Sequence, residues 1–385
     1  MLTLLWLACS AEDVTADFEA RKARALGEPA PWTEGWDTEV AMRLDGALVS
    51  TLIQSSANAE LKGLEPIDVG GIGEVKLKGE MTQARLTKST CEGCVGLAGT
   101  IEGTARLKVK GVKQALPFTL RFKGQLQFDS VEVGAGRNLT MSLKKVQDLE
   151  LELAGYEGQL GGGLKKQVKT LLGRVDAVDL GPIGSPNLPL RDLRLRGDKE
   201  GLTIEALATC VEGAGTRLPA WGRHDFSVVL SEGVLLDSAR KEAFNAGDVS
   251  GEHGLDIHAE PTSLHFEGDR FTMGLRVWRL EGTGWWRDYT LEGPVSVKRG
   301  FVRLKAESLE QGEKSPGAAI VDPLSWLGEG FIMDTMAEAA QGGFPTRDAF
   351  AVGDTKLTTA LTGVEGQGGA LVLMGKATVV QPTKK

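Results

Sequence analysis

The sequence has few of the residues on which catalytic and metal sites usually depend. It contains four histidines and four cysteines among 385 residues. It has no Gly-x-Ser-x-Gly motif of the kind that presents a nucleophilic serine. The net charge is −8 and no basic stripe is present, which disfavours a nucleic-acid partner. We therefore predict that the protein is not an enzyme and has no catalytic residue, no cofactor and no metal.

Long apolar runs are also missing from the interior of the chain. No interior segment approaches the roughly 18 consecutive apolar residues that a bilayer-spanning helix needs. Glycine is abundant instead, with 51 residues, which is about twice its average share. These glycines lie among alternating apolar positions, a distribution typical of the bulges and tight turns of strongly curved sheets.

The first residues indicate export. Residues 1–9 are a short apolar run that ends in Cys9, and Ser10 and acidic sequence follow. This run resembles a bacterial lipoprotein signal, which implies that Cys9 is acylated and that the chain is periplasmic and anchored to the outer membrane. An ordinary cleaved signal, which leaves a secreted chain, is the alternative. Residues 10–38 are then predicted as a tether with a short helix at residues 17–26.

The internal cysteines favour an oxidising compartment. Cys91 and Cys94 flank a Glu-Gly pair that predicts a hairpin turn, so we predict a local disulfide between them. A redox motif of this spacing would open a helix after a strand. A zinc site would need a second cysteine pair, whereas Cys210 stands alone.

One group of histidines and carboxylates leaves two interpretations. Asp256, His258 and Glu260 share one face of a predicted strand, and a turn would bring His265 opposite His258. Such a set could hold a transition metal. A solvated outer face of a strand explains the same pattern, and this is what we predict.

The pattern of predicted elements occurs twice along the chain. Each half opens with a strand, a glycine and an amphipathic helix, at residues 39–59 and again at residues 225–244. Period-two alternation of apolar residues follows in both halves, for instance at Phe118, Leu120 and Phe122. This alternation predicts antiparallel strands with one covered face and one wet face.

A longer helix follows the strands of each half. Apolar residues recur at helical spacing at residues 159–175 and at residues 326–341. Two further strands, joined by a glycine-bearing turn, then close each half. We therefore predict two tandem domains, at residues 39–222 and at residues 223–385.

This order of elements resembles the tubular lipid-binding superfamily of bactericidal/permeability-increasing-like proteins. The resemblance covers about residues 39–380 and rests on element order and on the repeat. It implies an α+β fold of two tandem repeats, in each of which a strongly curved antiparallel sheet wraps a long helix. An apolar tube between sheet and helix would hold acyl chains. Animal members have a disulfide between the long helix and a strand, whereas residues 159–175 contain no cysteine.

The same resemblance implies a ligand, a phospholipid or another acyl lipid, and a membrane-tethered lipid binder or carrier. Burying one acyl chain of about 16 carbons gains on the order of 10 kcal/mol, so such a tube needs no catalytic residue. The predicted lipid-binding residues are Leu48, Leu52, Leu164, Val168, Leu171, Trp326, Phe331, Met333 and Met336. A well-packed core explains the same residues, so a structural or partner-binding lipoprotein without a ligand cavity is the alternative.

Overall fold

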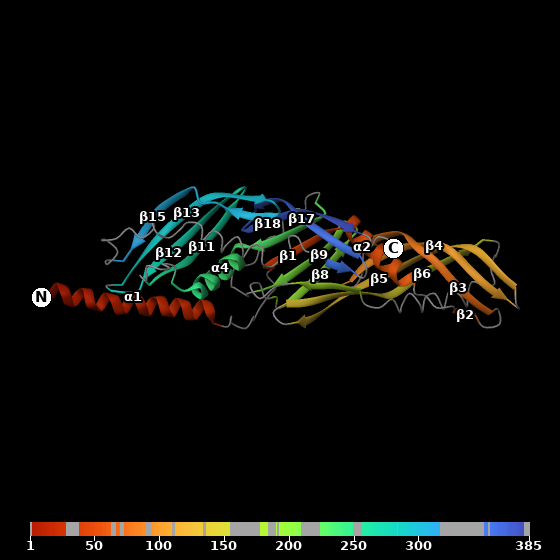
Figure 1. The fold of residues 1–385 in the computed structure, drawn as a ribbon, viewed down its shortest axis with the longest axis horizontal. Coiled ribbons are helices and arrows are strands. Elements are labelled where there is room, and N and C mark those ends of the chain that lie inside the picture. The colour runs from red at the N-terminus through yellow and green to blue at the C-terminus, as the bar shows by residue number, and fades with distance from the viewer. Residues whose placement is uncertain are drawn as a thin grey trace.

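The computed structural model shows an elongated molecule with a β-sheet at each end and a third sheet between them (Figure 1). The structure describes residues 2–27, 38–62, 67–69, 73–88, 94–109, 112–133, 136–154, 178–183, 190, 192–208, 224–248, 256–282, 284–315, 350–352 and 355–380. None of the helices within these ranges combines the length and the apolarity that crossing a bilayer requires.

A six-stranded antiparallel sheet forms one end of the molecule, in the order β2-β3-β4-β5-β6-β7. Its strands are β2 (Ile67–Val69), β3 (Gly73–Thr87), β4 (Cys94–Val109), β5 (Val112–Val133), β6 (Gly136–Leu153) and β7 (Val178–Ile183). Neighbours in this sheet are also neighbours in sequence, so each strand pairs with the one that follows it along the chain. This confirms the antiparallel pairing that the alternation predicts.

A second antiparallel sheet forms the other end, in the order β11-β12-β13-β14, and β15 also pairs with β13. Its strands are β11 (Ile257–Glu267), β12 (Arg270–Arg279), β13 (Trp285–Lys298), β14 (Phe301–Leu304) and β15 (Ser308–Lys314). β13 pairs with β15 along its first half and with β14 along its last residues. Both end sheets are therefore built from consecutive strands of one half of the chain.

The central sheet contains strands from both halves, in the order β16-β17-β18-β10-β1-β9-β8. Its strands are β1 (Val40–Asp45), β8 (Asp192–Asp198), β9 (Gly201–Leu207), β10 (Phe226–Ser231), β16 (Phe350–Val352), β17 (Thr355–Gly366) and β18 (Ala370–Val380). β1 and β10 pair antiparallel at its centre, with Val40 opposite Leu230. The two halves thus share one hydrogen-bonded sheet, while the domain boundaries at residues 39–222 and 223–385 stay a prediction.

Three helices occur in the described part of the chain: α1 (Leu2–Leu26), α2 (Gly46–Lys62) and α4 (Glu232–Ala246). α2 and α4 each begin directly after a strand of the central sheet and have a side-chain cap. Asp45 accepts a hydrogen bond from the backbone N–H of Ala47 at 2.8 Å. Ser231 accepts one from the N–H of Val234 at 3.2 Å. A polar cap satisfies helix N–H groups that otherwise have no partner, which explains why the chain turns into a helix at these points.

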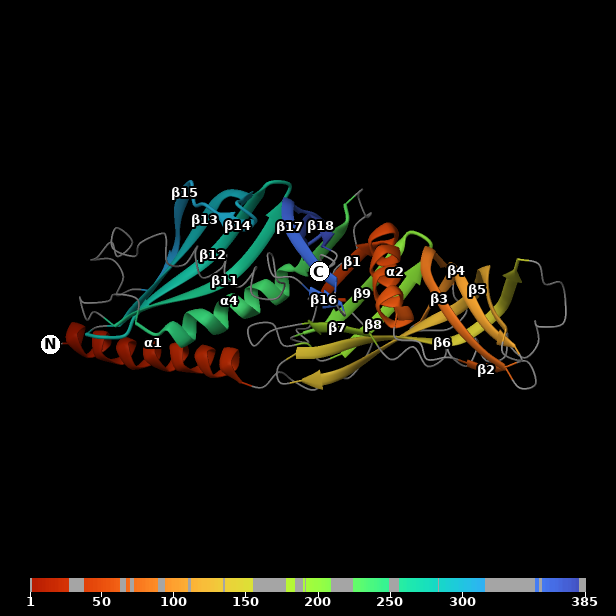
Figure 2. The same ribbon diagram turned by 45° about the vertical axis from the view of Figure 1, so that its right-hand side comes forward.

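The predicted α+β fold, in which each sheet wraps a long helix, is wrong. The described chain is mostly β, in several antiparallel sheets, and its helices lie beside these sheets (Figure 2). β5, for example, has 22 residues, and it pairs with β4 over residues 112–127 and with β6 over residues 118–133. Long strands of this kind are stabilised by ladder hydrogen bonds rather than by a central helix. The two predicted long helices, residues 159–175 and 326–341, lie outside the described residues.

One apolar core joins the three sheets. It runs from Leu77 and Phe118 in the first end sheet, through Leu230 in the central sheet, to Leu275 in the second end sheet. Glycines allow aromatic rings to lie close to the sheet backbone. Gly99 lies opposite Phe122 in the β4–β5 pair, and a Cβ atom at Gly99 would lie 2.5 Å from Cζ of that ring.

Candidate functional site

The six-stranded sheet has a continuous apolar face, which we call the inner face. One cross-strand row illustrates it, because Met81, Ile101, Leu120 and Leu151 lie opposite one another on β3, β4, β5 and β6. Leu151 is partly buried, and further buried apolar residues on these strands are Val75, Leu77, Leu86, Val95, Leu97, Ala105, Phe118, Phe122, Leu126, Phe128, Leu139, Met141, Leu143 and Val146. Rows of large apolar residues on long strands therefore make an inner face without charged side chains at these positions.

Helix α2 contributes residues to two different apolar clusters. Val49 and Ile53 belong to the core that includes the inner face. The predicted lipid-binding residues Leu48 and Leu52 are also buried, but they form a separate small cluster against the central sheet. Their neighbours there are Leu44, Ala377 and Val379. Leu48 and Leu52 therefore pack between α2 and strand β18 rather than with the inner-face rows.

The remaining predicted lipid-binding residues lie outside the described residues. They are Leu164, Val168, Leu171, Trp326, Phe331, Met333 and Met336. Cys9 lies within α1, but its side chain is outside the described part. α1 spans residues 2–26, so it continues across the predicted boundary between the signal, residues 1–9, and the tether, residues 10–38. Cys94 is disulfide-bonded, while Cys91, its predicted partner, is outside the described residues.

The second end sheet has an inner face of mixed character. Phe271, Met273 and Leu275 of β12 are buried in the main core. Two buried polar residues of β13 share this face, because Tyr289 lies opposite Leu275 and Arg287 lies opposite the next core residue of β12, Val277. The first end sheet therefore offers the more uniformly apolar of the two inner faces.

The outer face of the second end sheet carries two cross-strand rows of aromatic and charged residues. His258, Trp278 and Trp286 form one row, and Glu260, Arg276 and Asp288 form the next, across β11, β12 and β13. Arg276 donates two hydrogen bonds to the carboxylate of Asp288, at 2.6 and 2.8 Å. Its guanidinium also lies 3.8 Å from the ring centroid of Trp286. The bonds to Asp288 raise the pKa of Arg276, against the effect of burial.

Helix α1 packs on these outer rows. Its Phe18 is 1% exposed, and the Phe18 ring centroid lies 4.7 Å from that of His258, 5.6 Å from that of Phe244 and 5.7 Å from that of Trp278. Phe244 belongs to α4, so α1 touches both the sheet and the neighbouring helix. We call Phe18, Phe244, His258 and Trp278, together with Arg21 and Glu260, the outer cluster.

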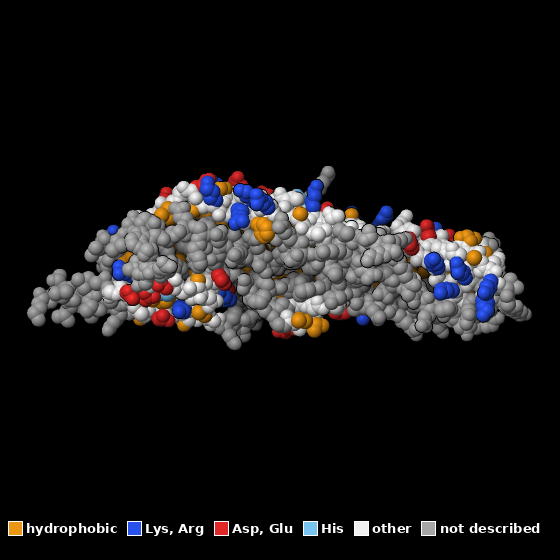
Figure 3. Space-filling view, in the orientation of Figure 1, with side chains coloured by type: hydrophobic (Ala, Val, Ile, Leu, Met, Phe, Trp, Pro, Cys, Tyr) orange, Lys and Arg blue, Asp and Glu red, His pale blue; other side chains and the backbone are white. Residues whose placement is uncertain are grey.

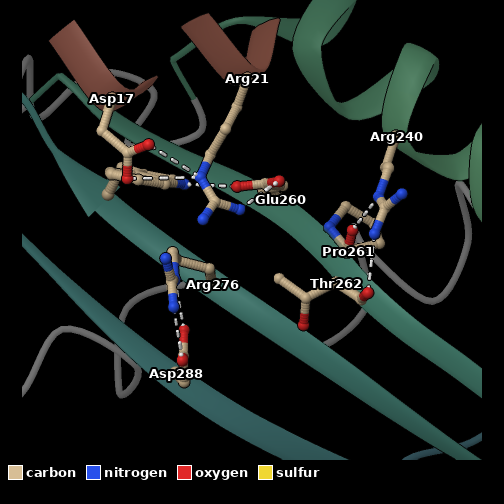
Figure 4. Close-up of polar contacts among 9 residues, drawn as sticks. Asp17, Arg21, Arg240, Glu260, Pro261, Thr262, Arg276 and Asp288 are labelled. Atoms are coloured by element: carbon tan, nitrogen blue, oxygen red, sulfur yellow. Dashed lines mark hydrogen bonds and ion pairs between the residues drawn. The ribbon is translucent and has the colours of Figure 1, made fainter. Parts of the chain in front are cut away.

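The polar part of the outer cluster centres on Glu260 (Figure 4). Its carboxylate is buried and accepts a bond from Nη1 of Arg21 at 3.3 Å and one from the indole N–H of Trp278 at 3.1 Å. Asp17, one turn earlier on α1, holds Nε of Arg21 at 3.2 Å. Arg21 also lies 5.6 Å from the ring centroid of Trp278, a cation–π distance. A buried carboxylate thus has its ion-pair partner on α1.

A β-bulge lies next to Glu260 on the same strand. The pairing of β11 with β12 shifts register between Pro261 and Ser263. Arg240 of α4 donates to the carbonyl oxygens of Pro261 and Thr262, both at 2.7 Å (Figure 4). Burial lowers the pKa of Arg240, and the neighbouring carboxylate of Glu260 opposes this shift. A guanidinium remains charged in proteins, so Arg240 holds α4 to the bulge as a cation.

The prediction that His258 and Glu260 lie on a solvated strand face is wrong. They are 8% and 4% exposed, because α1 covers them. His258 contacts Asp256 at 2.8 Å and His265 contacts Glu232 at 3.0 Å, so the two histidines have different partners. No cluster of metal-ligating side chains occurs among the described residues. The sequence does carry one sign that this outer face is covered, the adjacent Trp285 and Trp286. Neighbouring strand residues point to opposite faces, so two aromatic residues in succession require cover on both faces of the sheet.

A group of basic residues lies at the far tip of the six-stranded sheet. Lys76, Lys78, Arg106, Lys108 and Lys113 are exposed on its outer face, where Figure 3 shows lysine and arginine side chains gathered over β3–β5. Lys76 lies directly opposite Arg106, and Lys108 opposite Lys113. Like charges in such pairs destabilise a sheet, and none of these five forms an ion pair with another described residue. The local positive charge contrasts with the net charge of −8.

Comparison with known proteins gives distant structural similarity. No protein-family model and no curated protein matches the sequence. A lipopolysaccharide binding protein is similar at 11% identity and TM-score 0.36, over 89% of this chain and 99% of that chain. P47 of Clostridium botulinum E1 is similar at 10% identity and TM-score 0.45, over 89% and 100%. P47 from Clostridium botulinum A2 has 8% identity and TM-score 0.39, over 88% and 97%.

Proposed function

We propose that this protein binds lipid without catalysing a reaction, and that acyl chains lie along the inner face of the six-stranded sheet. The observation that carries the proposal is the continuous apolar inner face of β3–β6. Acyl chains have the chemistry that such a face accommodates, since burying each CH₂ group contributes about 0.8 kcal/mol. Orientation of the chains then needs few polar groups.

The basic tip of the same sheet supports contact with anionic lipid headgroups. These five cations, which form no ion pair within the described part of the chain, lie toward the end of β4 and the start of β5. Lysines and arginines near an anionic membrane surface each contribute on the order of 1 kcal/mol to binding. The outer face of the tip would thus meet headgroups, while the inner face of the same strands receives the acyl chains.

The proposed location is the periplasm, with the chain anchored to the outer membrane through Cys9. The disulfide at Cys94 supports an oxidising compartment. The resemblance of residues 1–10 to a lipoprotein signal supports the anchor. An ordinary cleaved signal would instead leave a secreted chain, and acylation of Cys9 distinguishes the two.

Native mass spectrometry of the purified protein tests the lipid proposal, because bound lipid adds a discrete mass. The informative variant is Ala105→Trp, which adds bulk to the buried inner face, and its control is Ala115→Trp on the exposed outer face of β5. If acyl chains occupy the inner face, the new ring takes lipid space, so lipid content falls while stability is retained. The control variant should keep its lipid.

The opposite result identifies a structural or partner-binding protein without a ligand site. In an inner face filled by side chains alone, Ala105→Trp overpacks the core and costs about 1–3 kcal/mol of stability. No lipid would then be detected in the parent protein or in the Ala115→Trp control.

Sedimentation with phosphatidylglycerol vesicles tests the proposed contact of the basic tip with headgroups. Replacing Lys76 and Lys108 with glutamine should weaken sedimentation with these vesicles but not with neutral ones.

A further inference from the structure

The side of the second end sheet that faces the core changes from apolar to cationic along its strands. Phe271 and Leu275 of β12 are buried in the main core, and Arg279 is the last core-facing residue of that strand. The turn before β12 lies against the central sheet, where Gly268 forms a bridge with Gly366 of β17. Arg279 therefore lies at the other end of the strand, away from the central sheet, which we call the far end.

Three cations share the far end of this side. Arg287 of β13 lies directly opposite Lys314 of β15, and Arg279 lies opposite Trp285, two positions before Arg287. Arg287 is buried, Arg279 is partly buried and Lys314 is exposed. Like charges that lie opposite each other destabilise a sheet, so positive charge is concentrated here at a cost in stability.

No carboxylate accompanies these cations among the described core-facing residues of β11, β12 and β13. Arg279 and Lys314 form no ion pair with a carboxylate in the described part of the chain. Nε of Arg279 is buried and has no hydrogen-bond partner there. On the opposite side of the same strands, by contrast, Arg276 pairs with the carboxylate of Asp288. A buried cationic donor without an acceptor is costly, so the far end is suited to an anion.

The chemistry of this side matches the two parts of an amphiphile. A guanidinium binds carboxylate and phosphate through paired hydrogen bonds, and a lysine adds a point charge. The apolar row that leads away from Arg279, from Val277 to Phe271, spans roughly 20 Å at about 3.4 Å per residue. One leaflet of a bilayer core is about 15 Å deep, so this row is long enough for an acyl chain.

We propose that the second end sheet binds an anionic amphiphile, whose carboxylate or phosphate contacts Arg279 and Lys314 beside Arg287. Its alkyl chain points from the far end toward Val277 and Leu275. This site goes beyond the proposed function, because it lies on the other end sheet and selects the charge of its ligand. Either site can therefore fail without the other.

Quenching of tryptophan fluorescence by a bromine-labelled fatty acid separates the two sites. Residues 37–220, which include the whole six-stranded sheet, contain no tryptophan, whereas Trp285 lies directly opposite Arg279. The probes are bromine-labelled hexadecanoate, its methyl ester as the uncharged match, and bromine-labelled lysophosphatidylglycerol as the phosphate form. Trp285→Phe identifies the signal of this site. The variants are Arg279→Gln and Lys314→Gln, and the control is Lys298→Gln, an exposed residue at the other end of β13.

We expect hexadecanoate to quench Trp285 at a concentration on the order of tenfold lower than its ester does, because only the acid accepts charged hydrogen bonds. Arg279→Gln should remove this preference, Lys314→Gln should reduce it, and Lys298→Gln should leave it unchanged. Quenching by lysophosphatidylglycerol that Arg279→Gln weakens would add phosphate headgroups to the ligands of the site.

Equal quenching by acid and ester, or an unchanged preference in both variants, overturns the site. If Arg279→Gln lowers the midpoint of urea denaturation, Lys314→Gln decides the test, because Lys314 is exposed. Ala105→Trp on the six-stranded sheet should not alter this quenching. Loss of the lipid site proposed there and loss of this one are therefore distinguishable.

Discussion

The close approach of Phe122 to Gly99 gives a quantitative test of the inner face. A Cβ atom at Gly99 would lie 2.5 Å from Cζ and 2.6 Å from Cε1 of the Phe122 ring, and the nearest atoms it would meet all belong to that ring. Carbon atoms prefer separations of about 3.5–4 Å, so Gly99→Ala requires the ring to move by about 1 Å. Phe122 is 2% exposed, and its neighbours must move with it.

The expected loss of stability follows from two opposing contributions. Displacing the buried Phe122 ring from its contact with the β4 backbone costs about 1–3 kcal/mol, whether or not lipid lies farther out on the inner face. Replacing a strand glycine with alanine returns roughly 0.5–1 kcal/mol, because the unfolded chain loses conformational freedom. We therefore expect Gly99→Ala to lower the free energy of unfolding by about 1–2 kcal/mol in urea denaturation, at an unchanged m-value.

Two controls identify the ring as the cause. Gly312 on β15 is exposed, and a Cβ atom there would meet Asp288 at an ordinary 3.4 Å, so Gly312→Ala should be neutral or slightly stabilising. In a Phe122→Leu background the ring is absent. The loss of unfolding free energy caused by Gly99→Ala should then be smaller than in the parent, by at least about 0.5 kcal/mol. A neutral Gly99→Ala variant, or an equal cost in both backgrounds, would refute the assigned packing of ring and glycine.

Further predictions concern a helix cap, an ion pair and the N-terminus. Ser231→Ala removes the cap of α4 and should cost about 1 kcal/mol in urea denaturation, whereas Ser231→Gly should cost only a few tenths. Arg276→Lys loses the bidentate pairing with Asp288 and the contact with Trp286, so it should lower the melting temperature by more than Arg24→Lys on exposed α1 does. Cys9→Ser should abolish palmitate labelling in a bacterial host and release the chain from membranes. Equal labelling of this variant and the parent would exclude the lipid anchor.

The sequence alone determined the apolar face of the strands in the six-stranded sheet. Alternation placed Phe118, Leu120 and Phe122 on one face, and all three are buried in the structure. This pattern is local, because neighbouring strand residues point to opposite faces whatever the strand packs against. Caps and turns are equally local, so strand–helix units such as those at residues 39–59 and 225–244 could be predicted.

Only the tertiary structure decided which elements meet. The pairing of β1 with β10 joins residues far apart in sequence, and no periodicity specifies that partner. The cover over Glu260 and Trp278 comes from Phe18 and Arg21, more than 200 residues earlier in the chain. Alternation predicts one apolar and one polar face, but it does not say that a polar face will be covered. Which cation pairs with a buried carboxylate depends on which one lies close to it in the folded chain, and that distance is set only once the sheets have formed.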